Sequence, residues 1–371
     1  MNKSLLFTID FPPHVGGVAN YYREFCNHLP SDKIVVLALK SGKELDFNYK
    51  VYREKLIAGK FIWPKWLPAF WYLYKVVKKE KIKNVLVGQG LPLGIVAYCL
   101  SKILKFDYYI IFHGLDIVTT KKIKRKRFLM EKIFTKVKGV IANSEFTKRE
   151  ILEMGLNENK IKVLYACPHF KPPAKNNIKE DIIKKYNLEN KKILLSVGRA
   201  VERKGFDRVI KAMEKVVNKD EKVVYLLAGG KGVYTEQLKN LIKNSLVKDN
   251  IIFLEETVDE EVKALYDLCA VFIMPSRQIG SDVEGFGIVY LEANLFGKPV
   301  IGGRSGGAVE AVVDNKTGLV VDPENISEIS EAILKLIKNP DLAKKLGEEG
   351  RTRAEQEFTW DKQVQKLKNI L

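Results

Sequence analysis

Residues 271–293, VFIMPSRQIGSDVEGFGIVYLEA, contain a strand, a loop and the start of a helix. The run VFIMPS has the length and apolar composition of a buried strand. The glycine-containing loop after it carries Glu284, and a second carboxylate, Glu292, lies in the otherwise apolar helix pattern. A strand that leads through a loop into a helix is the unit of parallel α/β sheets, in which ligands bind beyond the carboxyl ends of the strands.

The same unit recurs along the whole chain. Val/Ile/Leu-rich runs of strand length alternate with stretches of helical periodicity, which indicates parallel sheets covered on both faces. The runs form two series, so we predict an α/β protein with two doubly wound, Rossmann-like domains. The predicted strands are residues 4–9, 34–39, 85–88, 108–112, 139–142 and 161–165, then 193–197, 223–228, 251–254, 271–274, 299–301 and 319–321.

A proline-rich segment separates the two series. Residues 167–177, CPHFKPPAKNN, hold three prolines and few apolar residues, as linkers do. We therefore predict an N-terminal domain over residues 1–167, a hinge over 168–177 and a C-terminal domain over 178–357. Asn339-Pro340 and Gly350 are predicted to end helices, and a last helix over about 358–371 is expected to pack back on the N-terminal domain.

Composition excludes several classes of protein. The 371 residues are 46% hydrophobic, enough for two cores, and the apolar runs are too short to span a bilayer. The early run SLLFTI reaches Asp10 and a Pro-Pro pair too soon for a signal-peptide core. The four cysteines have no CxxC spacing, so we expect a reducing, cytoplasmic location without disulfides or a metal site.

Two strand ends in the first half carry candidate ligand-binding residues. Gly16 and Gly17 precede a helix, where backbone N–H groups can approach an anion; an ordinary turn is the other interpretation. His113 directly follows the strand at residues 108–112, where it either contacts a ligand or bonds to a backbone carbonyl. The glycines of VGQGLPLG, residues 87–94, do not have dinucleotide-binding spacing, so we expect no nicotinamide cofactor.

Cations follow the first strand of the second half. Arg199 leaves that strand, and Lys204 precedes a glycine and a helix. A guanidinium fork and a compact ammonium together suit a diphosphate. Arg203 and Arg208 are interpreted as solvated surface charges instead.

The two carboxylates of the opening stretch suit a ligand with paired hydroxyls, such as a sugar or a ribose. A shared metal ion is disfavoured, because eight helical residues would separate Glu284 from Glu292 by roughly 12 Å. Burying Glu292 without a partner would cost several kcal/mol, so a bound partner is expected there.

The ordered combination of these motifs resembles the family 4 retaining glycosyltransferases with the GT-B fold. The motifs are the Gly16-Gly17 pair, HG at residue 113, GRAVERKG at residues 198–205, and two glutamates eight residues apart, followed by GKPVIGGRSGG. The resemblance implies two domains facing each other across a cleft, a nucleoside-diphosphate sugar as donor substrate, and no metal or other cofactor.

The resemblance also implies a role for each matched residue. Arg199 and Lys204 would stabilise the leaving diphosphate, which Gly16 and Gly17 would also meet. Glu284 would hold donor-sugar hydroxyls with the N–H groups that follow it, Glu292 would bind the ribose, and His113 would contact the sugar beside its anomeric carbon. The implied catalytic set is His113, Arg199, Lys204 and Glu284; the donor-binding set is Gly16, Gly17, Arg199, Lys204, Glu284, Phe286, Gly287, Ile288 and Glu292.

Within that family, VEGFGIVYLEA and GGRSGGAVEAV are most similar to phosphatidylinositol mannosyltransferases and related enzymes of glycolipid or surface polysaccharide assembly. This similarity predicts transfer of a hexose, with mannose favoured, from GDP-mannose to a lipid-linked or glycan acceptor. UDP-sugars are the second donor class. The alternative functions are a sugar-nucleotide epimerase of the same fold and a basic nucleic-acid-binding protein.

Positive charge is concentrated in the first half. Residues 1–171 carry 31 Lys and Arg against 14 Asp and Glu, whereas residues 172–371 carry 32 against 31. In the first half, residues 121–138 hold nine cations and one Glu, and residues 61–83 combine aromatic side chains with lysines. The predicted membrane and acceptor face consists of Trp63, Trp66, Trp71, Lys75, Lys78 and Lys79.

Aromatic residues beside cations favour an anionic lipid surface, so we predict a peripheral enzyme at the inner face of the cell membrane. The other interpretation is that the aromatic residues are core and the cations are the solvated backs of helices. A nucleic-acid partner is not expected, because no nucleic-acid-binding module is recognisable.

Overall fold

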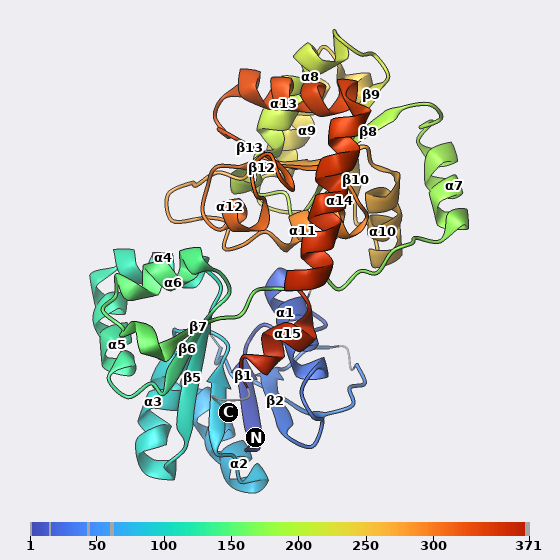
Figure 1. The fold of residues 1–371 in the computed structure, drawn as a ribbon. Helices are drawn as coiled ribbons and strands as arrows, with labels where there is room; N and C mark the ends of the chain where they lie inside the picture. Colours follow the sequence, from blue (N-terminus) through green and yellow to red (C-terminus); the bar gives the residue numbers. More distant parts are fainter. Residues whose placement is uncertain (1, 15, 43–44, 60–62, 368–371) are drawn as a thin grey trace. The chain divides into compact units, whose positions relative to one another are not determined.

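The computed structural model describes residues 2–14, 16–42, 45–59 and 63–367, and the chain divides into two compact units (Figure 1). The N-terminal unit comprises Met1–Cys167 with Trp360–Leu371, and the C-terminal unit comprises Pro168–Thr359. Among the described residues, no helix is both long and apolar enough to cross a membrane.

The N-terminal unit is built on a seven-stranded parallel sheet. Its strand order is β3-β2-β1-β4-β5-β6-β7, so the direction of strand addition reverses between β1 and β4. Such a reversal places the crossover helices on opposite faces of the sheet. The strands are β1 Ser4–Thr8, β2 Ile34–Leu39, β3 Lys50–Glu54, β4 Asn84–Val87, β5 Asp107–Phe112, β6 Gly139–Ala142 and β7 Ile161–Val163.

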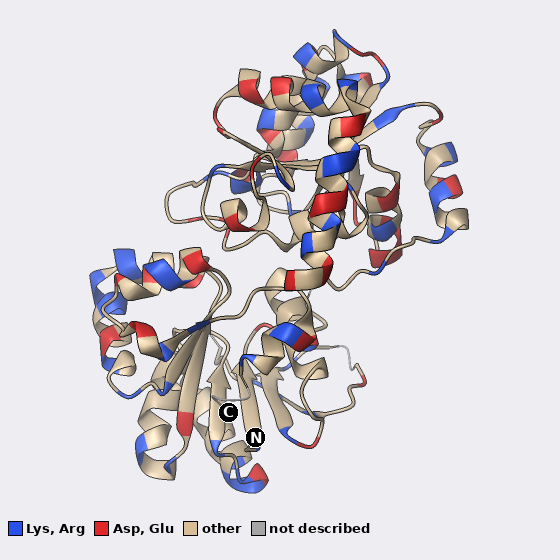
Figure 2. Ribbon diagram, viewed as in Figure 1, with Lys and Arg blue, Asp and Glu red and all other residues tan. Residues whose placement is uncertain are grey.

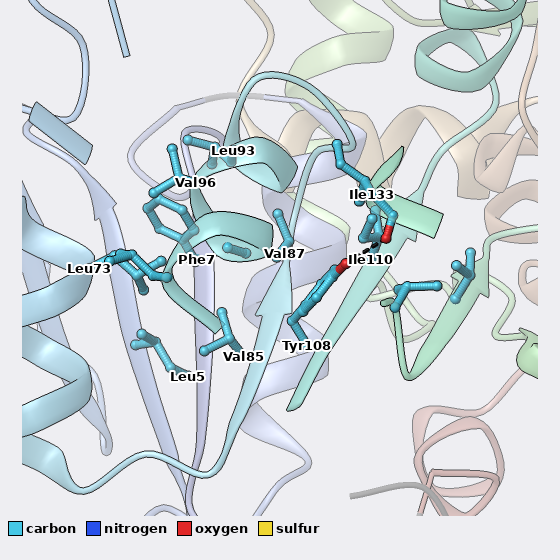
Figure 3. Packing of buried hydrophobic residues seen from close by; sticks show 14 of the residues in the cluster. Leu5, Phe7, Leu73, Val85, Val87, Leu93, Val96, Tyr108, Ile110 and Ile133 are labelled. Atoms are coloured by element: carbon cyan, nitrogen blue, oxygen red, sulfur yellow. Dashed lines mark hydrogen bonds between the residues drawn. The ribbon is translucent and has the colours of Figure 1, made fainter. Parts of the chain in front are cut away.

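Helices of the N-terminal unit bury apolar stripes against this sheet. They are α1 Gly17–Asn27, α2 Leu67–Glu80, α3 Leu93–Leu104, α4 Leu115–Lys122, α5 Lys124–Phe134, α6 Glu145–Leu152 and α15 Trp360–Gln365, with the short 3₁₀ helix η1 Glu158–Lys160. Figure 3 shows Leu73 of α2 and Leu93 of α3 on the side of Phe7 of β1, and Ile133 of α5 beside Ile110 of β5. All five are at most 1% exposed, so this layer is a continuous core.

Helix α15 joins the N-terminal unit although it follows the C-terminal unit in sequence. The buried ring of Trp360 lies edge-on to Tyr21 of α1, with ring centroids 5.0 Å apart. Gln363 accepts a hydrogen bond from the backbone N–H of Tyr165 at 3.2 Å. The last residues of the helix expected at 358–371, residues 368–371, lie outside the described residues.

The C-terminal unit is built on a six-stranded parallel sheet of order β10-β9-β8-β11-β12-β13, which reverses between β8 and β11. Its strands are β8 Lys192–Val197, β9 Val223–Gly229, β10 Ile251–Glu255, β11 Val271–Met274, β12 Val300–Gly303 and β13 Gly318–Val321. Its helices are α7 Asn176–Lys185, α8 Phe206–Val217, α9 Thr235–Lys243, α10 Asp259–Leu268, α11 Ile288–Leu295, α12 Ala308–Ala311, α13 Ile326–Lys338 and α14 Pro340–Glu357, with 3₁₀ helices η2 Glu202–Lys204 and η3 Lys248–Asn250. The predicted fold class of two doubly wound parallel sheets is confirmed.

Two details differ from the sequence-based expectation. Strand β3 was not predicted, because its sequence KVYRE is charged and it is the partly exposed edge strand of its sheet. Gly350 does not end a helix: α14 continues through it to Glu357. A Cβ at Gly350 would lie 2.3 Å from the Asn294 side chain of α11, so the glycine permits close helix packing.

Candidate active site

The two sequence motifs of the C-terminal unit lie at the reversal of its strand order. The loop after β8 carries Arg199 and Lys204, and the loop after the adjacent strand β11 carries Glu284. Carboxyl ends of strands at such a switch point form the usual ligand crevice of an open α/β sheet. The fold therefore brings together residues that are 80 positions apart in sequence.

Lys204 and Glu284 form a buried ion pair. The Lys204 Nζ donates to Glu284 Oε2 at 2.6 Å, and the two side chains are 11% and 10% exposed. Burial alone would raise the pKa of Glu284, but the charges and hydrogen bonds of Lys204 and Arg203 outweigh burial and lower it to about 2. Burial lowers the pKa of Lys204 below its usual value, although Glu284 opposes this effect.

Arg203 is part of the same cluster, which corrects its interpretation as a solvated charge. Its Nη1 donates to Glu284 Oε2 at 2.6 Å, and its Nε lies 2.9 Å from Asp282 Oδ1. Both cations thus bind one oxygen of Glu284, and within the described part of the chain Oε1 has no hydrogen-bond or ion-pair partner. That oxygen can accept a hydrogen bond from a ligand hydroxyl.

Arg208 is also paired rather than simply solvated. It contacts Glu324 and lies 3.6 Å from Asp207, near the buried Arg277, which donates to Asp207 at 3.0 Å. This charged network joins the start of α8 to the loop after β11. Sequence reasoning missed it because paired and solvated arginines look alike without their neighbours.

Gly205 fixes the direction in which Lys204 leaves the loop. Its φ of 73° lies in the left-handed region, and an added Cβ would stand 2.2 Å from the Pro275 carbonyl oxygen. Only glycine fits both conditions without a backbone shift. The turn ends η2 and begins α8 immediately after the buried lysine.

Arg199 differs from the other cations of this loop. Its side chain is exposed, and it makes no ion pair within the described ranges. The guanidinium is therefore available to an anionic ligand at the carboxyl end of β8.

The start of α11 supplies backbone donors after Glu284. Gly287 caps the helix with φ 88°, and Ile288 is its first residue. The N–H groups of a first helical turn have no partner within the helix. Phe286 is 2% exposed and packs on Phe358 with ring centroids 5.6 Å apart, so its ring belongs to the core of the unit.

Glu292 has partners within the protein, so its burial alone does not require a bound ligand. The carboxylate is 4% exposed, accepts from the Tyr266 hydroxyl at 2.9 Å and lies 3.2 Å from His169 Nδ1. Both partners are far from Glu292 in sequence, so spacing alone could not reveal them.

The remaining predicted donor residues lie in the N-terminal unit. Gly16 and Gly17 stand at the start of α1, where an added Cβ would meet no described atom within 4 Å. His113 follows β5, and its Nε2 lies 2.8 Å from the Tyr22 hydroxyl. The ring partner is thus a side-chain hydroxyl rather than a backbone carbonyl, and burial lowers the pKa of His113 to about 3.

The predicted membrane face separates into exposed and packed residues. Trp63 and Trp71 are 77% and 57% exposed, whereas Trp66 is partly buried against the core. Lys75, Lys78 and Lys79 are exposed on α2, and Lys75 Nζ stands 4.7 Å from the centroid of the Trp71 ring. Phe61 and Ile62 of this run lie outside the described residues.

A second basic surface adjoins this face. Figure 2 shows Lys and Arg over much of α5 and at the end of α4. Arg125 of α5 lies over the Trp63 ring at 6.0 Å, and Phe128 of α5 is 58% exposed. The cationic run at residues 121–138 therefore contacts Trp63, which precedes α2.

Two family profiles match the chain in succession. The profile described as Glycosyltransferase Family 4 matches residues 15–167, and the one described as glycosyl transferases group 1 matches residues 178–353. A GDP-mannose-dependent monoacylated alpha-(1-6)-phosphatidylinositol monomannoside mannosyltransferase of Corynebacterium glutamicum is 30% identical over 100% of this chain and 97% of its own. The GDP-mannose-dependent alpha-(1-6)-phosphatidylinositol monomannoside mannosyltransferase of Mycobacterium tuberculosis is 28% identical over 100% and 98%.

Solved structures share the fold at lower identity. The HepE protein of Anabaena, determined with UDP, has a TM-score of 0.82 at 18% identity and covers 100% of both chains. Sucrose-phosphate synthase from Thermosynechococcus elongatus has a TM-score of 0.81 at 21% identity, over 100% of this chain and 98% of its own.

Two doubly wound parallel sheets, and the likeness of the whole chain to these solved structures, define the GT-B fold. The chain belongs to the group 1 and family 4 glycosyltransferases. Within that family it is similar along its whole length to phosphatidylinositol monomannoside mannosyltransferases, which confirms the predicted resemblance.

Proposed function

We propose that this chain is a retaining hexosyltransferase that moves mannose from GDP-mannose to a lipid-linked or glycan acceptor in glycolipid or surface polysaccharide assembly. The observation that carries the proposal is its similarity, over nearly full length, to two GDP-mannose-dependent enzymes that act on phosphatidylinositol mannosides. The buried cluster of Lys204, Arg203 and Glu284 supports the chemistry.

The reaction breaks the bond between the anomeric carbon and the diphosphate oxygen, and a bond from that carbon to the acceptor oxygen replaces it. Negative charge develops on the diphosphate, where Arg199 and Lys204 are proposed to stabilise it. The acceptor hydroxyl attacks the face that the leaving group vacates, which retains the anomeric configuration. Its proton passes to a phosphate oxygen of the departing diphosphate.

The sugar and nucleotide are proposed to be held by the predicted donor-binding residues. Glu284 Oε1 would accept hydrogen bonds from sugar hydroxyls, with N–H groups of residues 286–288 as donors beside it. Glu292 would bind the ribose while it keeps its contacts to Tyr266 and His169. Gly16 and Gly17 would approach the phosphates and His113 the sugar.

The proposed reaction uses no metal ion or other cofactor. The cations of the loop after β8 supply the positive charge that a metal would otherwise bring to a diphosphate. Arg199 is exposed and unpaired within the described ranges, and Lys204 is buried close behind it in sequence. The planar guanidinium of Arg199 and the compact ammonium of Lys204 together match the charges of two adjacent phosphates.

The donor assignment is tested by thermal unfolding of the purified protein with GDP, UDP, ADP, their sugar conjugates, NAD and a nucleic acid, without added metal. We expect GDP and GDP-mannose to stabilise the protein, by about 2.7 kcal/mol at 100 times the dissociation constant. A response to UDP-sugars alone would overturn the mannose donor, and a response only to NAD or to nucleic acid would overturn the transferase. NMR of the product then shows whether the sugar is transferred with its anomeric configuration retained. An epimerase would instead change the configuration of the sugar nucleotide without transferring the sugar.

The proposed site of action is the inner face of the cell membrane, reached through the N-terminal unit. Exposed Trp63 and Trp71 lie beside lysines of α2, a composition suited to an anionic lipid interface. The partly buried Trp66 is proposed to support α2 rather than to touch lipid.

Replacing Lys75, Lys78 and Lys79 with glutamine is expected to weaken binding to vesicles of anionic phospholipid roughly 100-fold, since each cation near such a surface contributes about 1 kcal/mol. Co-sedimentation with the vesicles measures the loss. A matched variant with glutamine at Lys335, Lys338 and Lys345, which are exposed in the C-terminal unit, has the same net charge and should bind like the unmodified protein. Equal losses in both variants would mean that net charge, and not this face, governs binding.

A further inference from the structure

The hydroxyl of Tyr22 connects helix α1 to two loops at the carboxyl edge of the N-terminal sheet, those after β4 and β5. Tyr22 is fully buried in α1, which follows β1. Its hydroxyl donates to the carbonyl oxygen of Gly88, the residue after β4. The same hydroxyl lies 2.8 Å from Nε2 of His113, the residue after β5.

These two contacts determine which nitrogen of His113 carries hydrogen. A carbonyl oxygen can only accept, so the single hydrogen of the Tyr22 hydroxyl is committed to Gly88. Toward His113 the hydroxyl therefore offers a lone pair, and Nε2–H must be the donor. In a neutral imidazole the other nitrogen, Nδ1, is then an acceptor.

The surroundings keep the ring in this state. Burial lowers the pKa of His113 to about 3, so the ring is neutral at physiological pH, and burial raises the pKa of Tyr22 well above its ordinary value. The backbone N–H of His113 donates to Asp116 Oδ1 at 3.0 Å, and Tyr21 packs edge-on against the ring. Within the described part of the chain, Nδ1 has no hydrogen-bond partner.

We propose that Tyr22 is a positioning residue that holds His113 in the Nε2–H tautomer, so that Nδ1 presents a hydrogen-bond acceptor to the donor sugar. The inference rests on the proposed function for the identity of the ligand. It specifies the chemistry that the ligand must have at this point, which is a hydroxyl that donates to Nδ1.

The tautomer has consequences for substrate choice and for the reaction. A neutral ring with an outward lone pair binds a hydroxyl and repels a carboxylate, so neutral hexoses are favoured over uronic acids. A neutral ring also adds no positive charge beside a sugar that becomes cationic as its bond to the diphosphate breaks. Deoxy donors lacking the contacting hydroxyl would leave Nδ1 without a partner.

The test is ¹⁵N NMR of protein labelled at its four histidines, with the His113 signals assigned by their loss in His113→Asn. The unmodified protein should show protonated Nε2 and unprotonated Nδ1, and Tyr22→Phe should shift both signals toward a tautomer mixture. Tyr21→Phe is the matched control. It removes a buried hydroxyl from the same helix, one that donates to Leu164, and should leave the tautomer unchanged.

Kinetics with the donor identified above complete the test. We expect Tyr22→Phe to lower kcat roughly tenfold, with a smaller change in KM, because the lost orientation matters most in the transition state. Removing the contacting hydroxyl from the donor should cost the unmodified enzyme more than it costs Tyr22→Phe. A protonated Nδ1 in the unmodified protein, or signals unmoved by Tyr22→Phe, would overturn the inference even in an active enzyme. The expected tautomer in a protein that binds no sugar nucleotide would overturn the proposed function instead.

Discussion

Replacing Lys204 with methionine is expected to lower the rate of sugar transfer roughly 10²–10³-fold, the usual loss when one fixed donor is removed from a developing negative charge. Lys204 is buried and is oriented by Glu284, so its charge is weakly screened and already in position before the reaction. Methionine keeps most of the length of the side chain and removes the ammonium. The rate is measured as release of nucleoside diphosphate in the presence of acceptor.

A matched control separates this effect from general damage. Lys211 lies on α8, the helix that Gly205 begins, but its side chain is exposed. Lys211→Met therefore removes the same group outside the site and should transfer sugar at the normal rate. Near-normal transfer by a folded Lys204→Met protein would show that the lysine does not act on the diphosphate.

Lys204 also illustrates what the sequence can predict. Its place after a strand and before a glycine was enough to select it, because a parallel sheet puts such loops at its ligand-binding edge. Its buried partnership with Glu284 was not predictable, since the two residues are 80 positions apart. Arg203 was misassigned for the same reason: only the folded loop shows that it binds Asp282 and Glu284.

The fold was predictable wherever strands are buried on both faces. Strands such as β2 and β11 are continuous apolar runs that no surface helix would have. Strand β3 was not predicted, because an edge strand needs few apolar residues. Its charged residues Lys50, Arg53 and Glu54 make its sequence resemble that of a loop. The partly buried Trp66 and the exposed Trp71 could not be told apart, because both belong to one aromatic run in the sequence.

Replacing Glu284 with glutamine is expected to lower the free energy of unfolding of the C-terminal unit at neutral pH, and to lower it much less at pH 2. The folded-state pKa of about 2 lies below the ordinary value of 4.5, so the unfolded chain takes up this proton first as pH falls. The stabilisation is therefore complete above about pH 4.5 and is lost as pH falls toward 2. The difference corresponds to about 3 kcal/mol, at the lower end of the cost of breaking a buried ion pair.

Urea unfolding between pH 2 and pH 7, followed by far-UV circular dichroism, measures this contribution. At pH 7 the Glu284→Gln protein should be about 3 kcal/mol less stable, because the buried Lys204 and the partly buried Arg203 then face a neutral amide. Toward pH 2 the stabilities of the two proteins should converge, since the protonated glutamate resembles the amide. All four tryptophans, residues 63, 66, 71 and 360, belong to the N-terminal unit, so their fluorescence follows that unit separately.

Glu348→Gln is the control for this comparison. Glu348 is exposed on α14 and lies 3.9 Å from Lys344, a surface pair that contributes well under 1 kcal/mol. Its pH profile should run parallel to that of the unmodified protein. If Glu284→Gln also gave a parallel profile, Glu284 would not be held ionised by Lys204 and Arg203, and the charge arrangement on which the proposed donor site depends would be wrong.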